Sequence, residues 1–282
     1  MILVADSGGT KTQWCGISGS HETDIITTIG LNPNFVSDES VIDVLSGEVL
    51  SRLDNLQINE IWFYGAGCGS MIAAKRVKNA ITKVLPSASV NVLTDLAGAA
   101  RGLLGHRKGY VCMIGTGSNS GYYNGEKITR NVPSLGFILG DEGSGAALGR
   151  KLLADYLRGI MPDNLSAEFR KRYGAEKDDV VSNVYSGVFP SRFVGGFVQF
   201  IRDNLSDSYC SDLVTKSFEE FVERNLKLYK TKDPTDIAVT GSVAWHFRDL
   251  LETVLKRNGF IISVIEREPI EGLVRFHKSN AT

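Results

Sequence analysis

The sequence predicts an α/β protein in which one supersecondary unit occurs twice. The chain opens with a short apolar strand, a turn of glycines and hydroxyl residues, and a second strand. The same arrangement returns at residues 110–123. In each half, strands and amphipathic helices then alternate, which is typical of βαβ units with parallel strands. A length of 282 residues also allows two domains of ordinary size.

The first turn follows an apolar run at residues 2–5, which is long enough for a buried strand and ends at Asp6. Gly8 and Gly9 let backbone N–H groups approach an anion closely, and the hydroxyl groups that follow supply further donors. An acid at the end of a strand can hold a divalent cation through water, as Mg²⁺ prefers. The turn therefore suits the phosphates of a metal–nucleotide complex. An ordinary β-hairpin with a Gly-Gly turn is the alternative.

The rest of the first half has the order of a ribonuclease-H-like unit, with three strands and then helix, strand, helix, strand, helix. We expect the further strands at residues 13–17, 23–29, 60–64 and 89–93 and the helices at 37–53, 71–85 and 96–104. Asp95 lies where the last strand passes into a helix, at the sheet edge where open α/β folds bind ligands. The alternative is that Asp95 or Thr94 only caps the helix.

The second half begins with strands at 110–114 and 121–123, which flank the turn at 115–120. Asn124-Gly125 is a hairpin signal and leads into a third strand at 127–132. A glycine-rich segment at 134–145 precedes a helix at 146–157. Its glycines indicate close approach of the backbone to a ligand, whereas the acid at Glu142 could simply serve the helix dipole.

The remaining elements complete the second unit. Residues 158–232 are expected to be mostly helical and show no distinct chemistry. Strands at 237–239 and 260–264 follow, and a terminal helix starts near residue 269. Gly241 lies at a turn from strand to helix, where the absence of a side chain leaves room for an adenine or ribose; a plain tight turn is the alternative.

These elements predict an α/β fold of two ribonuclease-H-like domains with duplicated βββαβαβα topology and a nucleotide cleft between them. The domain limits follow from the element order. We expect the first domain at 1–108, joined by the terminal helix at 269–282, and the second at 109–268, with a helical insert at about 158–232.

Composition argues against several classes of protein. Hydrophobic residues make up 43% of the chain, enough for two cores, and charged residues 22%. The net charge is −1, from 31 basic and 32 acidic residues, which gives no reason to expect a nucleic acid or an anionic membrane as partner. No window approaches a transmembrane helix in length, and the first apolar run is too short for a signal peptide.

The four cysteines, Cys15, Cys68, Cys112 and Cys210, stand far apart, without the spacing of a metal site. Widely spaced cysteines argue for free thiols in a reducing compartment and against a structural zinc or an iron–sulfur cluster. We therefore expect a cytoplasmic protein.

Four motifs give the chain a resemblance to a known family: Asp6-Ser-Gly-Gly-Thr-Lys-Thr12, Gly115-Thr-Gly-Ser-Asn119, Gly140-Asp-Glu-Gly-Ser144 and Thr240-Gly-Ser-Val243. With them, the chain resembles the N-acetylglucosamine kinases grouped with the BadF/BadG/BcrA/BcrD ATPases, in the sugar kinase, actin and heat-shock ATPase superfamily. The resemblance extends from Asp6 to Gly272. The chain is short for the family, and it lacks the cysteines with which the dehydratase-activator branch binds an iron–sulfur cluster.

The resemblance implies a role for each motif. Asp95 matches the family's catalytic base, and Asp6 would hold Mg²⁺ through water. ATP and its phosphates would meet Gly8, Gly9, Thr10, Lys11, Thr12, Gly115, Thr116, Gly117, Gly241 and Ser242. The amino sugar would meet Asn34, Ser118, Asn119, Gly136, Asp141 and Asp95. ATP would be the co-substrate, and a homodimer is expected.

Several functions fit this resemblance. The first is ATP-dependent phosphorylation of a hydroxyl group, O6, of N-acetylglucosamine. A kinase for glucosamine or N-acetylmuramic acid is the alternative that nothing in the sequence excludes, because Asn34 and Asp141 would bind hydroxyl groups that these sugars share. An ATPase that drives a partner protein and a nucleotide-binding regulator without turnover are the non-kinase alternatives. Asp95, together with Asn34 and Asp141, favours a kinase over both.

Overall fold

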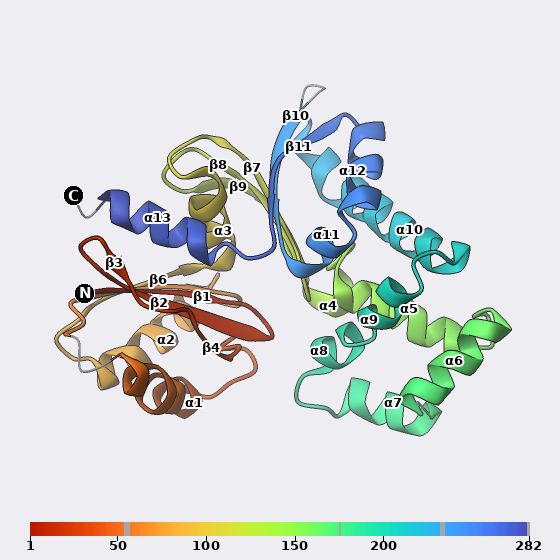
Figure 1. Ribbon diagram of the computed structural model, residues 1–282, viewed down its shortest axis with the longest axis horizontal. Coiled ribbons are helices and arrows are strands. Elements are labelled where there is room, and N and C mark those ends of the chain that lie inside the picture. Colours follow the sequence, from red (N-terminus) through yellow and green to blue (C-terminus); the bar gives the residue numbers. More distant parts are fainter. Residues whose placement is uncertain (54–56, 175, 232–234, 281–282) are drawn as a thin grey trace. The chain divides into compact units, whose positions relative to one another are not determined.

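The computed structural model describes residues 1–53, 57–174, 176–231 and 235–280, and its strands form two sheets (Figure 1). The chain divides into two compact units. Unit 1 comprises Met1–Val111, Gly121–Arg130 and Glu268–Thr282, and unit 2 comprises Cys112–Ser120 and Asn131–Arg267. The predicted α/β class is confirmed. The domain limits expected from the sequence stay a prediction, because compact units need not coincide with domains that fold independently.

The first sheet has the strand order β3-β2-β1-β5-β6, and β4 also pairs with β2. Its strands are β1 (Ile2–Ser7), β2 (Lys11–Ser18), β3 (His21–Glu22), β4 (Ile26–Ile29), β5 (Glu60–Gly65) and β6 (Ser89–Thr94). β1, β5 and β6 are parallel, and Ser7, Gly65 and Thr94 stand in register at their carboxyl ends. This register brings the first turn and the start of the helix after β6 to one edge of the sheet.

Helical layers cover both faces of this sheet. The helical segments are α1 (Asp38–Asp43), the π-helix η1 (Val44–Val49), the 3-10 helix η2 (Leu50–Arg52), α2 (Met71–Val84), α3 (Asp95–Leu104) and α13 (Ile270–Asn280). Leu3 and Ala5 of β1 belong to the core shared with α1, η1 and α2. Val4, between them, belongs to the core shared with α13. Alternate residues of the strand thus reach opposite layers.

The second sheet repeats the strand order of the first, with the order β11-β10-β7-β8-β9. Its strands are β7 (Gly109–Ile114), β8 (Ser118–Tyr123), β9 (Ile128–Val132), β10 (Thr235–Thr240) and β11 (Phe260–Glu266). In both sheets the first strand of the half lies in the centre: β1 lies between β2 and β5, and β7 lies between β8 and β10. The predicted duplication is therefore visible in the topology and in the order of the elements.

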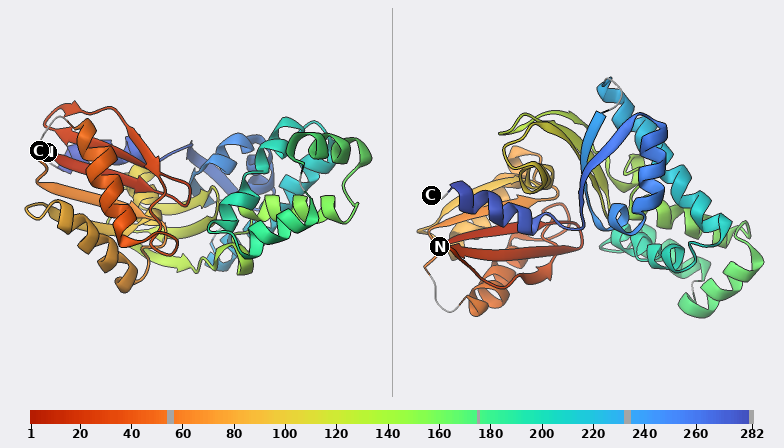
Figure 2. Two further views of the ribbon diagram at one scale, coloured as in Figure 1. Left: turned by 90° about the horizontal axis from the view of Figure 1, so that it is seen from below. Right: turned by 45° about the horizontal axis from the view of Figure 1, so that its top comes forward.

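Unit 2 also contains the expected helical insert (Figure 2). The helical segments of unit 2 are α4 (Gly136–Leu139), α5 (Gly145–Leu157), α6 (Asp163–Tyr173), α7 (Lys177–Tyr185), α8 (Pro190–Gly195), α9 (Val198–Asp203), α10 (Ser208–Arg224), η3 (Leu226–Tyr229), α11 (Ser242–His246) and α12 (Arg248–Arg257). The insert comprises α6 to η3. Aromatic rings pack around Phe169, with centroids of Tyr156 and Phe200 at 4.7 and 5.0 Å. These buried rings form part of a hydrophobic core in unit 2.

Some element limits differ from the prediction. The strand expected at 23–29 begins only at Ile26, as β4, and Thr23 is instead hydrogen-bonded to Gly16 through its hydroxyl and its backbone N–H. The helix expected at 37–53 starts as predicted at the cap Ser37 but continues as π and 3-10 turns. The turn expected to extend to residue 120 ends earlier, since β8 begins at Ser118. The helix expected after Gly241 is interrupted at Phe247.

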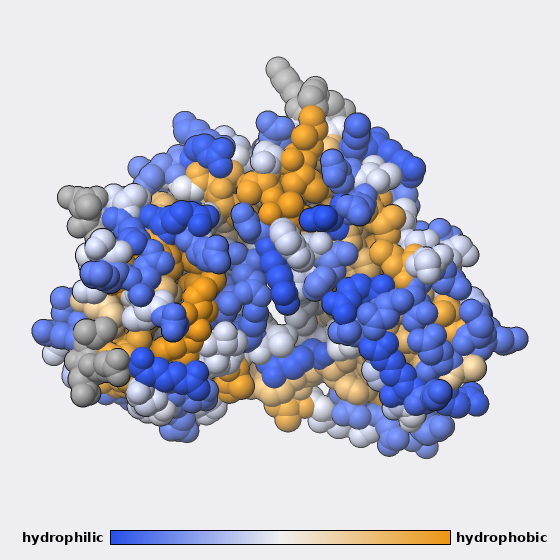
Figure 3. All heavy atoms as spheres, viewed as in Figure 1, coloured by the Kyte–Doolittle hydropathy of each residue, from blue (hydrophilic) through white to orange (hydrophobic). Residues whose placement is uncertain are grey.

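No helix in the described part of the chain has both the length and the apolar character needed to cross a membrane. In the face of the molecule shown in Figure 3, apolar residues form separate patches between hydrophilic ones.

We expect a buried histidine to make unit 1 sensitive to acid. His277 is 4% exposed, and its Nε2 lies 2.8 Å from Tyr64 Oη. Burial, and to a smaller extent the charge of Arg101, lowers the pKa of His277 from 6.5 to about 4. The folded state therefore binds fewer protons than the unfolded state between these values, and its stability falls as the pH drops from 6.5 to 4, by on the order of 3 kcal/mol.

The thermal midpoint between pH 7 and pH 4.5, measured for the wild type and for His277→Gln, tests this expectation. The variant should lose stability at pH 7 but show a shallower decline on acidification. Substitution of the exposed His21 by Gln should leave the wild-type slope unchanged. Equal slopes in the wild type and His277→Gln would show that another group causes the loss.

Candidate functional site

The predicted site residues form two groups, one in each unit. Unit 1 contains Asp6, Gly8, Gly9, Thr10, Lys11, Thr12, Asn34 and Asp95. Unit 2 contains Gly115, Thr116, Gly117, Ser118, Asn119, Gly136, Asp141, Gly241 and Ser242. Within each unit, the fold brings together residues that are distant in the sequence.

The first turn is closed tightly by Gly30, which was not among the predicted site residues. The Gly8 N–H donates to the Lys11 carbonyl at 2.9 Å, and the Gly30 N–H donates to the Thr10 carbonyl at 3.0 Å. A Cβ atom at position 30 would lie 2.6 Å from the Gly8 carbonyl oxygen. Gly30 is therefore required for the loop after β4 to lie against this turn. The glycine itself was the only signal for this in the sequence.

Two residues that were predicted to contact phosphate, Lys11 and Thr12, form contacts with other residues of unit 1. Thr12 is fully buried, and its Oγ1 lies 2.8 Å from Ser7 Oγ and donates to the Ile29 carbonyl at 2.9 Å. Lys11 forms an ion pair with Glu268. Thr12 thus joins the strands that carry the turn, and Lys11 links the turn to the segment before α13. Thr10, at the tip, is exposed.

Asp6 lies partly buried at the end of β1, in an acidic environment. The pKa of the Asp6 carboxyl is raised to about 7, mainly by burial and then by the neighbouring carboxylates of Asp95 and Glu268, while Lys11 opposes the shift. The charged form of Asp6 is therefore costly without a counter-ion. The position of Glu268 beside this turn could not be predicted from the sequence, because Glu268 lies 257 residues from Lys11.

Asp95 is the first residue of α3, but it is not the helix cap. The cap is Thr94, whose hydroxyl accepts a hydrogen bond from the Ala97 N–H at 3.2 Å. The Oδ1 atom of Asp95 accepts from the Leu96 N–H at 2.8 Å. The Asp95 charge raises the pKa values of both Asp6 and Cys68, and β1 and β6 end at the same edge of the sheet. The capping alternative thus applies to Thr94.

Asn34 lies exposed on a loop that Asn32 shapes. The side-chain oxygen of Asn32 accepts a hydrogen bond from the Asn34 N–H at 2.9 Å. Gly67 has a φ of +79°, and a Cβ atom there would lie 2.1 Å from this oxygen. The side chain of Asn32 therefore closes this turn. Asn34 is the exposed amide beside it.

In unit 2, Asp141 holds two predicted motifs together. It is 8% exposed, has a φ of +58°, and its Oδ1 accepts from the Ser118 N–H at 3.2 Å. A Cβ atom on Gly117 would lie 3.0 Å from its Oδ2. Burial raises the pKa of Asp141, and the Ser118 backbone opposes the shift. The left-handed backbone is uncommon for a residue other than glycine, and such conformations concentrate at functional sites.

The neighbouring polar groups are also ordered. Ser118 Oγ donates to the Glu142 carbonyl at 2.8 Å. The side-chain oxygen of Asn119 accepts from the Ser120 N–H and from Asn131 Nδ2, both at 2.9 Å. Gly136, with a φ of +73°, is exposed at the start of α4. These loops are thus held in place by their own hydrogen bonds.

The second turn lies between the start of α5 and Gly241. The N–H groups of Gly145 and Ala146 donate to the carbonyls of Gly115 and Thr116 at 2.8 and 3.0 Å. Gly241 has a φ of +116°, and a Cβ atom there would lie 2.4 Å from the Ile114 carbonyl oxygen. Ser242 is exposed and begins α11. The motifs near residues 115, 141 and 241 therefore meet within unit 2.

Comparison with known structures identifies the family to which the chain belongs. The structure of a protein from Porphyromonas gingivalis, named a putative N-acetylglucosamine kinase, is 38% identical, covers 100% of both chains and superposes with a TM-score of 0.93. The chain belongs to this family of sugar kinases. The predicted resemblance is confirmed. No family model matches the sequence, and no curated protein matches it.

More distant structures share the fold of this sugar kinase. A putative N-acetylglucosamine kinase from Chromobacterium violaceum is 18% identical, with coverage of 98% of each chain and a TM-score of 0.69. A ROK family glucokinase from Streptomyces griseus, in complex with glucose and AMPPNP, is 16% identical, with coverage of 98% and 97% and a TM-score of 0.58.

The residues of this sugar kinase fit a magnesium ion held mainly through water. Asp6 lies close enough to the carboxylates of Asp95 and Glu268 for their charges to raise its pKa. Within the described ranges, no three His, Cys, Asp or Glu side chains are placed to hold a metal directly. Mg²⁺ commonly keeps several waters and uses one or two carboxylates together with substrate phosphates. A single carboxylate in an anionic environment satisfies this requirement.

Proposed function

We propose that this sugar kinase transfers the γ-phosphate of ATP to O6 of N-acetylglucosamine. The observation that carries the proposal is the identity of 38% over the whole length of the Porphyromonas gingivalis protein. The placement of Asp95 beside Asp6 at one sheet edge supports it. The two-domain organisation expected from the sequence, with both groups of loops acting on one nucleotide, is part of this proposal.

In this reaction Asp95 would accept the proton of the sugar hydroxyl as the O6–phosphorus bond forms and the bond to the β-phosphate oxygen breaks. Phosphoryl transfer depends mainly on alignment and on neutralisation of charge. Backbone N–H groups of Gly9 and Gly117 suit the phosphate oxygens, as do the hydroxyls of Thr10 and Thr116. Gly8, whose N–H donates to the Lys11 carbonyl, keeps the turn closed. Bound Mg²⁺, held through water by Asp6, would neutralise phosphate charge.

The sugar would be oriented by the polar groups around the ordered loops. The exposed amide of Asn34 offers a donor and an acceptor together, as a hydroxyl group requires. Asp141 can accept charge-assisted hydrogen bonds, which are stronger than neutral ones. Ser118, Asn119 and Gly136 would complete the sugar contacts, while Gly241 and Ser242 would face the adenosine. A cytoplasmic homodimer is also part of the proposal.

A coupled assay of ADP release tests the function. The panel should contain N-acetylglucosamine, glucosamine, N-acetylmuramic acid and a control without sugar. We expect N-acetylglucosamine to accelerate ADP release by at least about tenfold, because binding of the correct sugar assembles the catalytic site. The 6-deoxy analogue should not be phosphorylated, since it lacks the accepting oxygen, and phosphorus NMR of the product should place the phosphate on C6.

Each other outcome identifies an alternative. Preference for glucosamine or N-acetylmuramic acid would change the substrate and retain the reaction. Full ADP release without any sugar would favour an ATPase that acts on a protein partner. Nucleotide binding without turnover on any sugar would favour a regulator.

A further inference from the structure

A pocket of about 290 Å³ lies between the C-terminal end of α3 and α13, within unit 1. Its charged lining consists of Arg101, His106, Arg107 and Arg275. None of the described residues that line it is acidic. The first lining residue, Arg101, is six positions after Asp95 on α3, so the pocket begins about 9 Å along this helix from Asp95. It is therefore separate from the residues assigned to catalysis.

The pocket exists because two helices cross where neither has a side chain. A Cβ atom on Gly272 of α13 would lie 2.0 Å from the Gly102 carbonyl oxygen. A Cβ atom on Gly102 of α3 would lie 2.7 Å from the Pro269 carbonyl oxygen. This close contact fixes α13 on α3, and the basic side chains near the crossing line a preformed opening.

Arg101 carries a charge that no carboxylate balances. Its Nη1 donates to Tyr64 Oη at 2.8 Å, and its guanidinium carbon lies 5.1 Å from the centre of the Trp62 ring and 5.2 Å from that of Phe276. These contacts hold the guanidinium in place without neutralising it. Within the described residues Arg101 has no ion pair. An anion in the pocket would supply the missing charge.

Arg107 and Arg275 add two further cations. Arg107 Nε and Nη2 donate to the carbonyls of Leu104 and Leu103 at 3.3 Å, which caps α3. A guanidinium has five N–H groups, so this side chain keeps others for a ligand. Arg275 is exposed, and its side chain forms neither a hydrogen bond nor an ion pair within the part of the chain that the structure describes.

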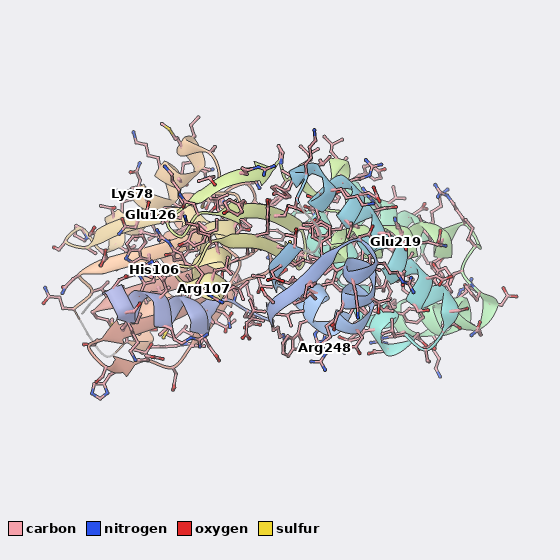
Figure 4. All side chains as sticks on the ribbon, turned by 90° about the horizontal axis from the view of Figure 1, so that it is seen from above. Lys78, His106, Arg107, Glu126, Glu219 and Arg248 are labelled. Atoms are coloured by element: carbon pink, nitrogen blue, oxygen red, sulfur yellow. The ribbon has the colours of Figure 1, made fainter. Side chains whose placement is uncertain are left out.

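Figure 4 shows His106 and Arg107 on the segment after α3, beside α13. The ring of His106 lies 4.9 Å from that of Phe276. Glu126, on the hairpin between β8 and β9, is labelled nearby but does not line the pocket. The charged lining is thus basic, although one acid stands in its neighbourhood.

We propose that this pocket binds a phosphate group, either as free phosphate or as the phosphate monoester of a small molecule. Planar guanidinium groups match phosphate geometry with paired hydrogen bonds, and a field of arginines without carboxylates attracts a dianion. The volume lies at the small end of the range for ligand sites, which suits a phosphate with a small organic group. The pocket shares no residue with the two glycine turns.

Isothermal titration calorimetry in phosphate-free buffer at low salt tests the site. Inorganic phosphate and N-acetylglucosamine 6-phosphate are titrated into the wild type and into Arg275→Gln, Arg107→Gln and Lys78→Gln. We expect saturable binding to the wild type, weakened about 10–100-fold by Arg275→Gln and by Arg107→Gln, because each removes a charge-assisted hydrogen bond. Lys78 is exposed on α2, so Lys78→Gln should leave the affinity within about twofold of the wild type.

Comparison of the two probes separates the sources of the phosphate group. Tighter binding of the sugar phosphate by the wild type, lost in Arg275→Gln, would assign the site to a phosphate monoester, and equal affinities would assign it to free phosphate. Arg275 is exposed, so its variant should keep the wild-type thermal midpoint. Absence of saturable binding, or binding that Arg275→Gln and Arg107→Gln leave unchanged, would overturn the proposal, because phosphate would then occupy another place such as the glycine turns.

Discussion

Asp95→Asn is expected to lower the turnover of the sugar kinase by about 10²–10⁴-fold, the usual effect of losing a general base. The amide keeps the shape of the side chain but cannot accept the hydroxyl proton. Sugar affinity should change much less, since an amide still forms hydrogen bonds. The thermal midpoint should also stay close to the wild type, because the cap of α3 is the Thr94 hydroxyl. Steady-state kinetics and thermal melts on the same preparation check all three points.

Thr94→Ala provides the matched control at the adjacent position. It removes the cap and should reduce stability by about 1 kcal/mol, with a smaller loss of turnover than Asp95→Asn. The two substitutions are thus expected to separate catalysis from helix capping. A near-normal turnover in Asp95→Asn would show that this carboxylate is not the base.

Asp6→Asn is expected to change activity and stability in opposite directions. Turnover with Mg·ATP should fall by about 10²-fold or more, because the carboxylate that would hold Mg²⁺ through water is lost. The ligand-free protein should become more stable at pH 8. The raised pKa of about 7 means that the folded state binds more protons than the unfolded state between pH 4 and 7, so the wild type loses stability as the pH rises through this window.

Thermal midpoints of the wild type and Asp6→Asn, measured from pH 4 to pH 8 with a chelator present, test the second effect. The advantage of the variant should be absent near pH 4, grow through the window and be complete above pH 7. Substitution of the exposed Asp24 by Asn should show no such trend. A lower midpoint for Asp6→Asn at pH 8 would contradict the assignment of Asp6 as an uncompensated carboxylate.

Local patterns were sufficient to predict the α/β class, the order of the elements and most of their positions. The short apolar strands, the two glycine-hydroxyl turns and the small-residue helix after Asp95 are each determined by neighbouring residues. The predicted limits of the elements were wrong where the local conformation depends on contacts with residues distant in the sequence. The expected third strand starts late, at Ile26, because Thr23 bonds to Gly16, and β8 begins at Ser118 because its neighbours continue the sheet.

In the candidate site, too, local sequence patterns indicated some features, and contacts across the fold determined the others. Asp6, Asp95 and Asp141 could be singled out because each stands at the end of a strand or a glycine run. Their surroundings could not be predicted. That Lys11 pairs with Glu268 and that Thr12 is fully buried follows from contacts across the fold.

The sequence by itself determined which residue types stand at the sheet edges, and so the two glycine-hydroxyl turns, the candidate base and the resemblance to the family. The tertiary structure decided which of those groups are buried, paired or exposed. A pKa of about 7 for Asp6 and an unbalanced charge on Arg101 both arise from the packing of α3 and the segment through α13 onto the first sheet. Electrostatic energies depend on distance and on exposure to water, and only the folded chain sets either one.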